Sequence, residues 1–191
     1  MTRTPRRPFR VCFVCTGNIC RSPMAESVFR TEAAAAGLGD RVVADSAGID
    51  GWHEGEGADP RTVAVLTAAG YPAAHRARRF DASWFADRDL VIALDGGHLR
   101  ALRRMAPGPD DAAKVHLLRA YDPAGPAPGT LDVPDPYHGG PAEFAGCLER
   151  IEAACAGLLA AVSDALTRGS SGAPPLPGDD TPSHPRSAHD R

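Results

Sequence analysis

Short apolar runs alternate with amphipathic segments along most of the chain. Four of these runs predict strands, over residues 9–15, 41–48, 89–95 and 114–122. The high apolar content of the first and third is typical of strands that are buried on both faces. Apolar residues at three- and four-residue steps, or a start and a stop signal, predict helices over 22–37, 59–70, 96–105 and 144–166. This alternation with short connections predicts an α/β domain with a parallel sheet.

The first two predicted helices carry local start signals. Ser22 is expected to cap the first helix, with Pro23 at the first helical position. Asp59 and Pro60 repeat the same pattern in the second helix, and Gly70 is expected to end it. In a parallel α/β sheet, ligands bind where strands lead into such helix N-termini. The first strand ends at this kind of position, at Cys15.

The composition changes at both ends of the chain. Residues 169–191 contain five Pro, three Gly and four Ser, and their only large apolar residue is Leu176. Such a segment cannot bury enough apolar surface to offset the entropy of ordering, which predicts disorder. Residues 1–7 are basic and expected to be flexible. We therefore expect one folded domain over 8–167, preceded by the basic N-terminus and followed by a disordered tail over 168–191.

Composition and charge exclude several classes of protein. A hydrophobic fraction of 43% in 191 residues suffices for one core, and a net charge of -3 does not indicate a nucleic-acid binder. No apolar run is long enough for a membrane span, and the run at 9–15 is too short for a signal peptide. Five cysteines, an odd number, argue against stable disulfides. We expect a cytoplasmic monomer without membrane contact, although export without a signal peptide stays open.

Three cysteines cluster around the end of the first strand, at Cys12, Cys15 and Cys20. Cys12 and Cys15 have the spacing of half a zinc site, but the sequence has no second Cys-x-x-Cys. A thioredoxin-like redox pair is disfavoured because the two residues between them continue the strand. Cys12 is therefore expected to be core. Cys147 and Cys155 lie on the apolar stripe of the last helix and are also expected to pack inertly.

Cys15 opens a segment of different chemistry, in which five residues separate it from Arg21. A loop of this length before a helix can turn its backbone N–H groups inward and bind an anion of phosphate size. Gly17 and Asn18 provide the backbone freedom that such a loop needs. The Arg21 guanidinium can hold two phosphate oxygens, and this environment favours a cysteine thiolate. The segment predicts attack of sulfur on phosphorus, giving a phosphocysteine.

The sequence VCTGNICRSP resembles the signature loop of low-molecular-weight protein tyrosine phosphatases. Further segments resemble this family in the same order, over about residues 9–166: DSAG (45–48), GWHEGEGADPRT (51–62), AAHRARRF (73–80), DLVIALD (89–95) and VPDPYHGG (133–140). The resemblance implies a doubly wound four-stranded parallel sheet with helices on both faces. It also implies a redox-sensitive signalling hydrolase that needs no metal or other cofactor and acts on phosphotyrosine-containing proteins.

The same resemblance implies roles for individual residues. Cys15 becomes the nucleophile, Arg21 binds phosphate, and Asp135 acts first as general acid and then as base. The hydroxyl of Ser22 donates to the sulfur and eases its departure. The phosphate-binding loop consists of Thr16, Gly17, Asn18, Ile19, Cys20 and Ser22. The resemblance also implies that Ser46 and His75 form a supporting network around Asn18. It further implies an aromatic mouth for the substrate, formed by Trp52, His53 and Tyr137.

Cys20 has two possible roles. By resemblance it forms a reversible disulfide with an oxidised Cys15, which protects the nucleophile from irreversible oxidation. The alternative is a small packed residue of the loop.

Three other functions are compared with phosphotyrosine hydrolysis. Arginine phosphatases of this fold typically carry Thr at the position of Ile19, and arsenate reductases need shuttling cysteines that are missing between Cys20 and Cys147. A phosphotyrosine-binding scaffold with an inactive site gains no support, because Cys15, Arg21 and Asp135 are all present.

Overall fold

A computed structural model describes residues 7–125, 131–169, 173, 174 and 176. Its strands are β1 (Phe9–Cys15), β2 (Val42–Gly48), β3 (Leu90–Ala93) and β4 (Val115–Leu117). Its α-helices are α1 (Arg21–Ala35), α2 (Pro60–Ala68), α3 (Gly96–Met105), α4 (Pro109–Ala112) and α5 (Pro141–Arg168), and its two 3-10 helices are η1 (Ala82–Asp87) and η2 (Leu118–Tyr121).

The strands form one parallel sheet in the order β2-β1-β3-β4. The central strand β1 pairs with β2, so that Cys15 lies opposite Gly48, and with β3, so that Val14 lies opposite Ala93. The chain therefore continues from β1 to one neighbour and returns to the other side, which is the doubly wound topology. The predicted four-stranded parallel α/β fold is confirmed.

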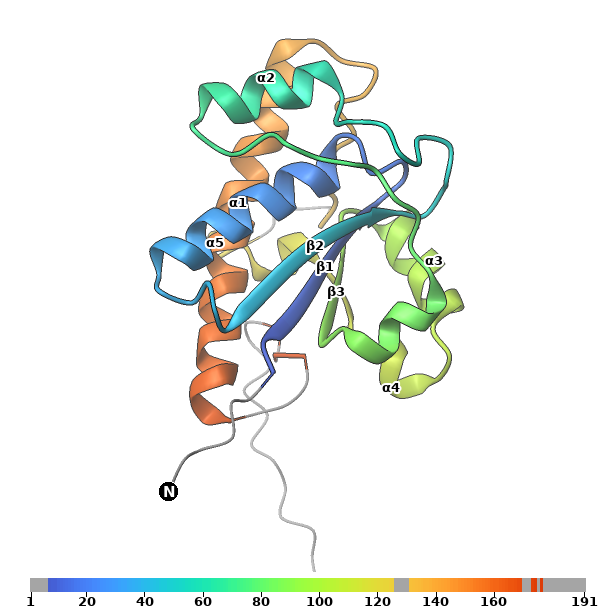
Figure 1. The fold of residues 1–191 in the computed structure, drawn as a ribbon, viewed down its shortest axis with the longest axis vertical. Helices are drawn as coiled ribbons and strands as arrows, with labels where there is room; N and C mark the ends of the chain where they lie inside the picture. Colours follow the sequence, from blue (N-terminus) through green and yellow to red (C-terminus); the bar gives the residue numbers. More distant parts are fainter. Residues whose placement is uncertain (1–6, 126–130, 170–172, 175, 177–191) are drawn as a thin grey trace, which may run out of the picture.

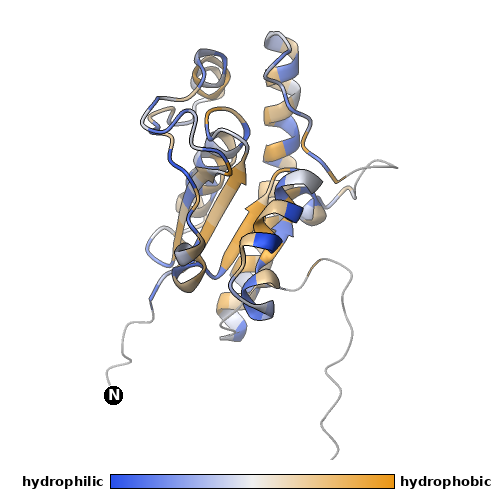
Figure 2. Cartoon of the chain, turned by 90° about the vertical axis from the view of Figure 1, so that its right-hand side faces the viewer, coloured by the Kyte–Doolittle hydropathy of each residue, from blue (hydrophilic) through white to orange (hydrophobic). Residues whose placement is uncertain are grey.

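Side chains of β1 alternate between two hydrophobic cores. Phe13 and Cys15 contribute to the core under α1, α2 and α5, whereas Cys12 and Val14 face the core under η1 and α3. Figure 1 shows these helices on opposite sides of the sheet, and Figure 2 shows the apolar strands between them. Cys12 is fully buried, as predicted, and so are the two cysteines of α5, with at most 2% exposure.

Two predicted boundaries are wrong. Helix α1 begins at Arg21, one residue before Ser22, and its N-cap Cys20 makes no side-chain capping bond. The Ser22 hydroxyl is instead turned toward the preceding loop. The fourth strand is only three residues long, because the chain continues as η2, where Leu118 and Tyr121 are both fully buried. A spacing of three places these two side chains on the same side of a 3-10 turn.

Other local predictions are confirmed. Asp59 caps α2 by accepting a bond from the Arg61 backbone N–H, and Pro60 is the first helical residue. Gly70, at φ +83°, follows the last turn. No helix among the described residues has the length and apolar character needed to cross a membrane.

The predicted flexible termini lie mostly outside the described residues. Helix α5 extends to Arg168 and ends at Gly169, whose φ of +74° favours glycine. In the predicted tail, Ala173 and Leu176 pack against the larger core.

Candidate active site

The loop between β1 and α1 lies at the carboxyl edge of the sheet, beside the end of β2. Gly48 permits this close approach, because a Cβ atom there would lie 2.7 Å from the carbonyl oxygen of Thr16 and 2.9 Å from that of Asp50. Both obstacles are backbone atoms and cannot rotate away. The sheet therefore fixes where the loop begins, and the missing side chain of Gly48 lets it fold back closely.

Four carbonyl groups of this loop point outward. Each accepts a hydrogen bond from outside the loop: Cys15 from Ile49 N (2.9 Å), Thr16 from Asp50 N (3.0 Å), Asn18 from His75 Nε2 (2.7 Å) and Ile19 from Asp59 N (2.9 Å). In a trans peptide the N–H points opposite to the carbonyl of the same unit. The following N–H groups are thus directed toward the concave side, an arrangement that is suited to binding an anion.

Asn18 occupies the left-handed region at φ +57°, and its fully buried amide holds the loop together. Its Nδ2 donates to the hydroxyls of Ser22 and Ser46, both at 2.9 Å, and its Oδ1 accepts from the Arg78 backbone N–H at 3.0 Å. Together with His75, these contacts place the predicted supporting residues around Asn18. The loop conformation therefore depends on contacts from two distant segments, β2 and the stretch that contains His75 and Arg78.

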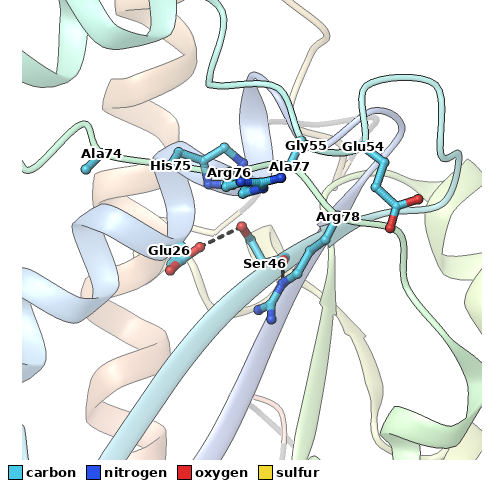
Figure 3. A pocket seen from close by; sticks show the side chains of 9 residues that line it. All are labelled: Glu26, Ser46, Glu54, Gly55, Ala74, His75, Arg76, Ala77 and Arg78. Atoms are coloured by element: carbon cyan, nitrogen blue, oxygen red, sulfur yellow. Dashed lines mark hydrogen bonds between the residues drawn. The ribbon is translucent and has the colours of Figure 1, made fainter.

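The network continues into a pocket behind the loop, with a volume of about 520 Å³. Ser46 donates to Glu26 at 2.6 Å, and Arg78 donates to the Ser46 carbonyl. Figure 3 shows Glu26 and Arg78 on either side of Ser46. Burial lowers the pKa of His75, which favours the neutral imidazole that bonds to Asn18. The sequence prediction missed Glu26, because its position in α1 carries no signal beyond that of an ordinary helix.

The sulfur of Cys15 lies at the base of the site, with the residue only 3% exposed. Ser22 Oγ is 3.0 Å from Cys15 Sγ and also lies 3.3 Å from the Ala47 carbonyl. A thiolate can only accept, so the hydroxyl is its available donor. The N-terminus of α1, which begins at Arg21, adds partial positive charge beside the sulfur. This environment is suited to a nucleophilic thiolate.

Arg21 joins both sides of the site. Its guanidinium is almost completely buried and donates to Asp95 through Nη1 and to Asp135 through Nη2, both at 2.8 Å. A third bond goes to the Val133 carbonyl at 3.2 Å. Asp135 is half exposed, and its second oxygen accepts from the Tyr137 backbone N–H. The structure thus brings together the loop arginine and the predicted acid.

Sequence analysis missed a second contact to the loop, made by His98 and Asp95. His98 Nε2 shares a 2.9 Å hydrogen bond with Thr16 Oγ1, while its backbone N–H donates to Asp95. Burial lowers the pKa of His98 to about 4. Burial opposes ionisation of Asp95, but bonds from the His98 backbone and from Arg21 outweigh it and lower its pKa. The position of Asp95 at the carboxyl end of a predicted strand was the available signal.

A cavity of about 300 Å³ opens above Cys15. It is lined by Cys15, Thr16, Gly17, Ile19, Cys20, Arg21, Trp52, His53, Asp135, Tyr137 and His138. All three predicted mouth residues are therefore present, and Trp52 is 82% exposed at the rim. His53 is held by a 2.8 Å contact with Glu56. No group of three His, Cys, Asp or Glu side chains in the described part of the chain is arranged to hold a metal ion.

Cys20 lies on the same loop and is buried. Burial raises its pKa to about 12, and burial raises that of Cys147 in α5 to the same range. All five cysteines are free thiols in this structure.

Comparison with known proteins covers the segment that carries this site. The profile of a family described as low molecular weight phosphotyrosine protein phosphatase matches residues 10–168. A low molecular weight protein-tyrosine-phosphatase from Streptomyces coelicolor is 68% identical over 82% of this chain and 94% of its own length. Low molecular weight protein-tyrosine phosphatase A from Mycobacterium tuberculosis is 46% identical over 84% of this chain and 96% of its own length. A crystal structure of a protein tyrosine phosphatase from Entamoeba histolytica matches with a TM-score of 0.77 and 31% identity, covering 83% of this chain and 99% of that chain.

Proposed function

Because the chain belongs to the low molecular weight phosphotyrosine protein phosphatase family, we propose that it hydrolyses phosphotyrosine in proteins through a phosphocysteine intermediate. One observation carries this proposal. A single cavity is lined by a buried cysteine, the arginine that follows it after five residues, a half-exposed aspartate and aromatic rim residues. Each of these groups has a task in transferring a phosphoryl group from a phenol to water.

In the first step, the Cys15 thiolate attacks phosphorus while the bond from phosphorus to the tyrosyl oxygen breaks. The inward N–H groups of the loop and the Arg21 guanidinium stabilise the charge on the three phosphoryl oxygens. Asp135 gives its proton to the leaving phenolate. This role is supported by the shared cavity, which both residues line, and by exposure, since Asp135 is half exposed whereas Cys15 is buried.

In the second step, the Asp135 carboxylate takes a proton from a water molecule that attacks phosphorus. The bond between sulfur and phosphorus breaks and the thiolate leaves with the electron pair. The Ser22 hydroxyl, 3.0 Å from the sulfur, stabilises that thiolate, and inorganic phosphate is released. No metal ion is required in either step.

Depth and rim chemistry favour an aryl substrate. The sulfur lies at the base of the cavity, and the rings of Trp52 and Tyr137 line its entrance, which suits a long planar phosphotyrosine. A panel of phosphotyrosyl, phosphoarginyl and phosphoseryl peptides, together with arsenate, tests this choice. We expect phosphotyrosyl peptides to have the highest kcat/KM. Preferential turnover of phosphoarginine or arsenate would assign the site to the corresponding alternative.

Variants test the proposed roles separately. Cys15→Ser is expected to abolish turnover, and Asp135→Ala to slow it by about 10²- to 10⁴-fold while phosphate binding is retained. Activity is expected to survive chelators and to be lost with vanadate. Full activity of Cys15→Ser would contradict the mechanism, and binding of phosphotyrosine without turnover by the unaltered protein would favour a scaffold.

We also propose that Cys20 protects Cys15 during oxidation. The Cys15 thiolate would attack one oxygen of peroxide and release hydroxide, giving a sulfenic acid, and the Cys20 thiolate would then displace hydroxide from that sulfur to give a disulfide. Since burial raises the Cys20 pKa to about 12, closure is expected to accelerate as pH rises. Detection of only sulfinic or sulfonic acid at Cys15, with no bridge to Cys20, would overturn this proposal.

We expect the enzyme to act as a cytoplasmic monomer in signalling. Five free cysteines are consistent with a reducing compartment. Light scattering of the purified protein and fractionation of the source cells test these two expectations.

A further inference from the structure

Arg61, the second residue of α2, connects that helix to the loop that carries Asp135. Its Nη1 donates to two backbone carbonyls of this loop, that of Tyr137 at 3.0 Å and that of Gly139 at 2.9 Å. The guanidinium also lies over the Phe144 ring, 4.5 Å from its centroid. One side chain therefore binds the loop at two points and contacts the first turn of the helix that follows it.

Asp59 fixes the direction of this guanidinium. Its two carboxylate oxygens accept from Arg61 Nε at 3.0 Å and from Nη2 at 2.8 Å, a bidentate geometry that leaves Nη1 pointing at the loop. The backbone N–H of Asp59 donates to the Ile19 carbonyl in the phosphate-binding loop at 2.9 Å. The Asp59–Arg61 pair thus contacts both halves of the site.

The loop of Asp135 is attached on both sides of the carboxylate. On the near side, the Val133 N–H donates at 2.8 Å to the carbonyl of Leu94, the residue that follows β3. On the far side, Tyr137 and Gly139 are held by Arg61. Asp135 lies between these two attachments. A shift of the backbone at Tyr137 and Gly139 would therefore displace the Asp135 carboxyl relative to the sulfur of Cys15.

We propose that Arg61 is a positioning residue for the reaction, setting the distance between the acid loop and the phosphate-binding loop. The inference rests on the proposed role of Asp135 as general acid. Arg61 itself is not required to touch the substrate. Arg61 holds the Tyr137 and Gly139 carbonyls and thereby the position of Asp135. Asp59, which binds Arg61, is itself hydrogen-bonded to Ile19 in the phosphate-binding loop.

This role predicts a dependence on the leaving group. Protonation matters most for a poor leaving group such as phenol and least for a good one such as p-nitrophenol. A displacement near 1 Å can cost about 10²-fold in rate. We therefore expect Arg61→Ala to lower kcat/KM for phenyl phosphate by roughly 10- to 100-fold, with a several-fold smaller loss for p-nitrophenyl phosphate. A purely structural loss of active enzyme would reduce both by the same factor.

The experiment compares Arg61→Ala and Arg61→Lys with Arg150→Ala, whose guanidinium donates only to the Gly146 carbonyl of its own helix among the contacts described. Each is measured with both substrates, alone and combined with Asp135→Ala. We expect the activity loss of Arg61→Lys to be intermediate, because one ammonium group cannot bind Asp59 and the two loop carbonyls in the way the planar guanidinium does. Arg150→Ala is expected to match the unaltered enzyme.

The combined variants separate the two proposals. If Arg61 acts through Asp135, Arg61→Ala lowers phenyl phosphate turnover little further once Asp135 is removed. Equal factors in both backgrounds, or equal losses on both substrates, would overturn the positioning role. If Asp135→Ala alone lowers kcat/KM by the same factor for phenyl phosphate and for p-nitrophenyl phosphate, the general-acid proposal itself fails. Should Arg61→Ala not fold, Arg61→Lys and Asp59→Asn decide by the same criteria.

Discussion

Replacing Asn18 with alanine tests whether its amide holds the phosphate-binding loop in shape. The substitution removes three buried hydrogen bonds, two donated by Nδ2 and one accepted by Oδ1. It also places alanine at φ +57°. At about 1 kcal/mol per bond, and about 1 to 2 kcal/mol for the left-handed backbone, we expect a loss of about 4 to 5 kcal/mol in the free energy of unfolding.

Asn18→Gly is the matched control, because glycine adopts the same φ without strain. It loses the same hydrogen bonds, so we expect it to be destabilised by about 1 to 2 kcal/mol less than alanine. Denaturant unfolding, with the slope checked for a constant two-state transition, measures both differences. Both variants are also expected to bind inorganic phosphate more weakly, because the N–H groups of the loop lose their fixed direction.

Two results would refute this reasoning. A loss below about 1 kcal/mol in both variants would mean that the amide bonds do not stabilise the loop. Glycine being as destabilising as alanine, or more so, would mean that the left-handed backbone is not a source of strain in this state.

Three further perturbations test neighbouring contacts. Gly48→Ala places a Cβ 2.7 Å from the Thr16 carbonyl oxygen, so we expect kcat/KM to fall about 10²-fold or more, measured with p-nitrophenyl phosphate; unchanged activity would contradict the close approach. NMR titration of His98 is expected to give a midpoint near pH 4 rather than 6.5; stability should therefore fall by about 3 kcal/mol as pH drops through this window, since only the unfolded state takes the proton, and His98→Asn should lack this slope. Asp95→Asn removes a charged partner of Arg21, and we expect phosphate inhibition to weaken about tenfold; an unchanged inhibition constant would show that Asp95 does not orient Arg21.

Local sequence signals were sufficient for the fold and for the centre of the site. Apolar runs located the strands, and Asp59 with Pro60 located the start of α2, because these signals act within a few residues. The burial of Cys12 followed from its place inside an apolar run. The short β4 was not predictable, since strand and 3-10 turn both bury the apolar residues of 115–121.

Contacts between distant segments were harder to predict. His98 and Thr16 are 82 positions apart, and Ser46 in β2 contacts Glu26 in α1, 20 positions away. Neither pair has a spacing that a helix or strand would impose, so their contact depends on the tertiary fold alone. The roles of the predicted site residues came from resemblance, and the structure adds their distances.

Rapid-quench mass spectrometry of the reacting enzyme tests the central proposal most directly. Asp135→Ala is expected to slow breakdown of the intermediate because it lacks the base for water. During turnover of a good aryl phosphate, we expect one phosphoryl group on the peptide that contains Cys15, and none in Cys15→Ala, which has no nucleophilic atom at this position. Phosphate on another residue, or rapid turnover by Asp135→Ala without any phosphoenzyme, would contradict the phosphocysteine mechanism.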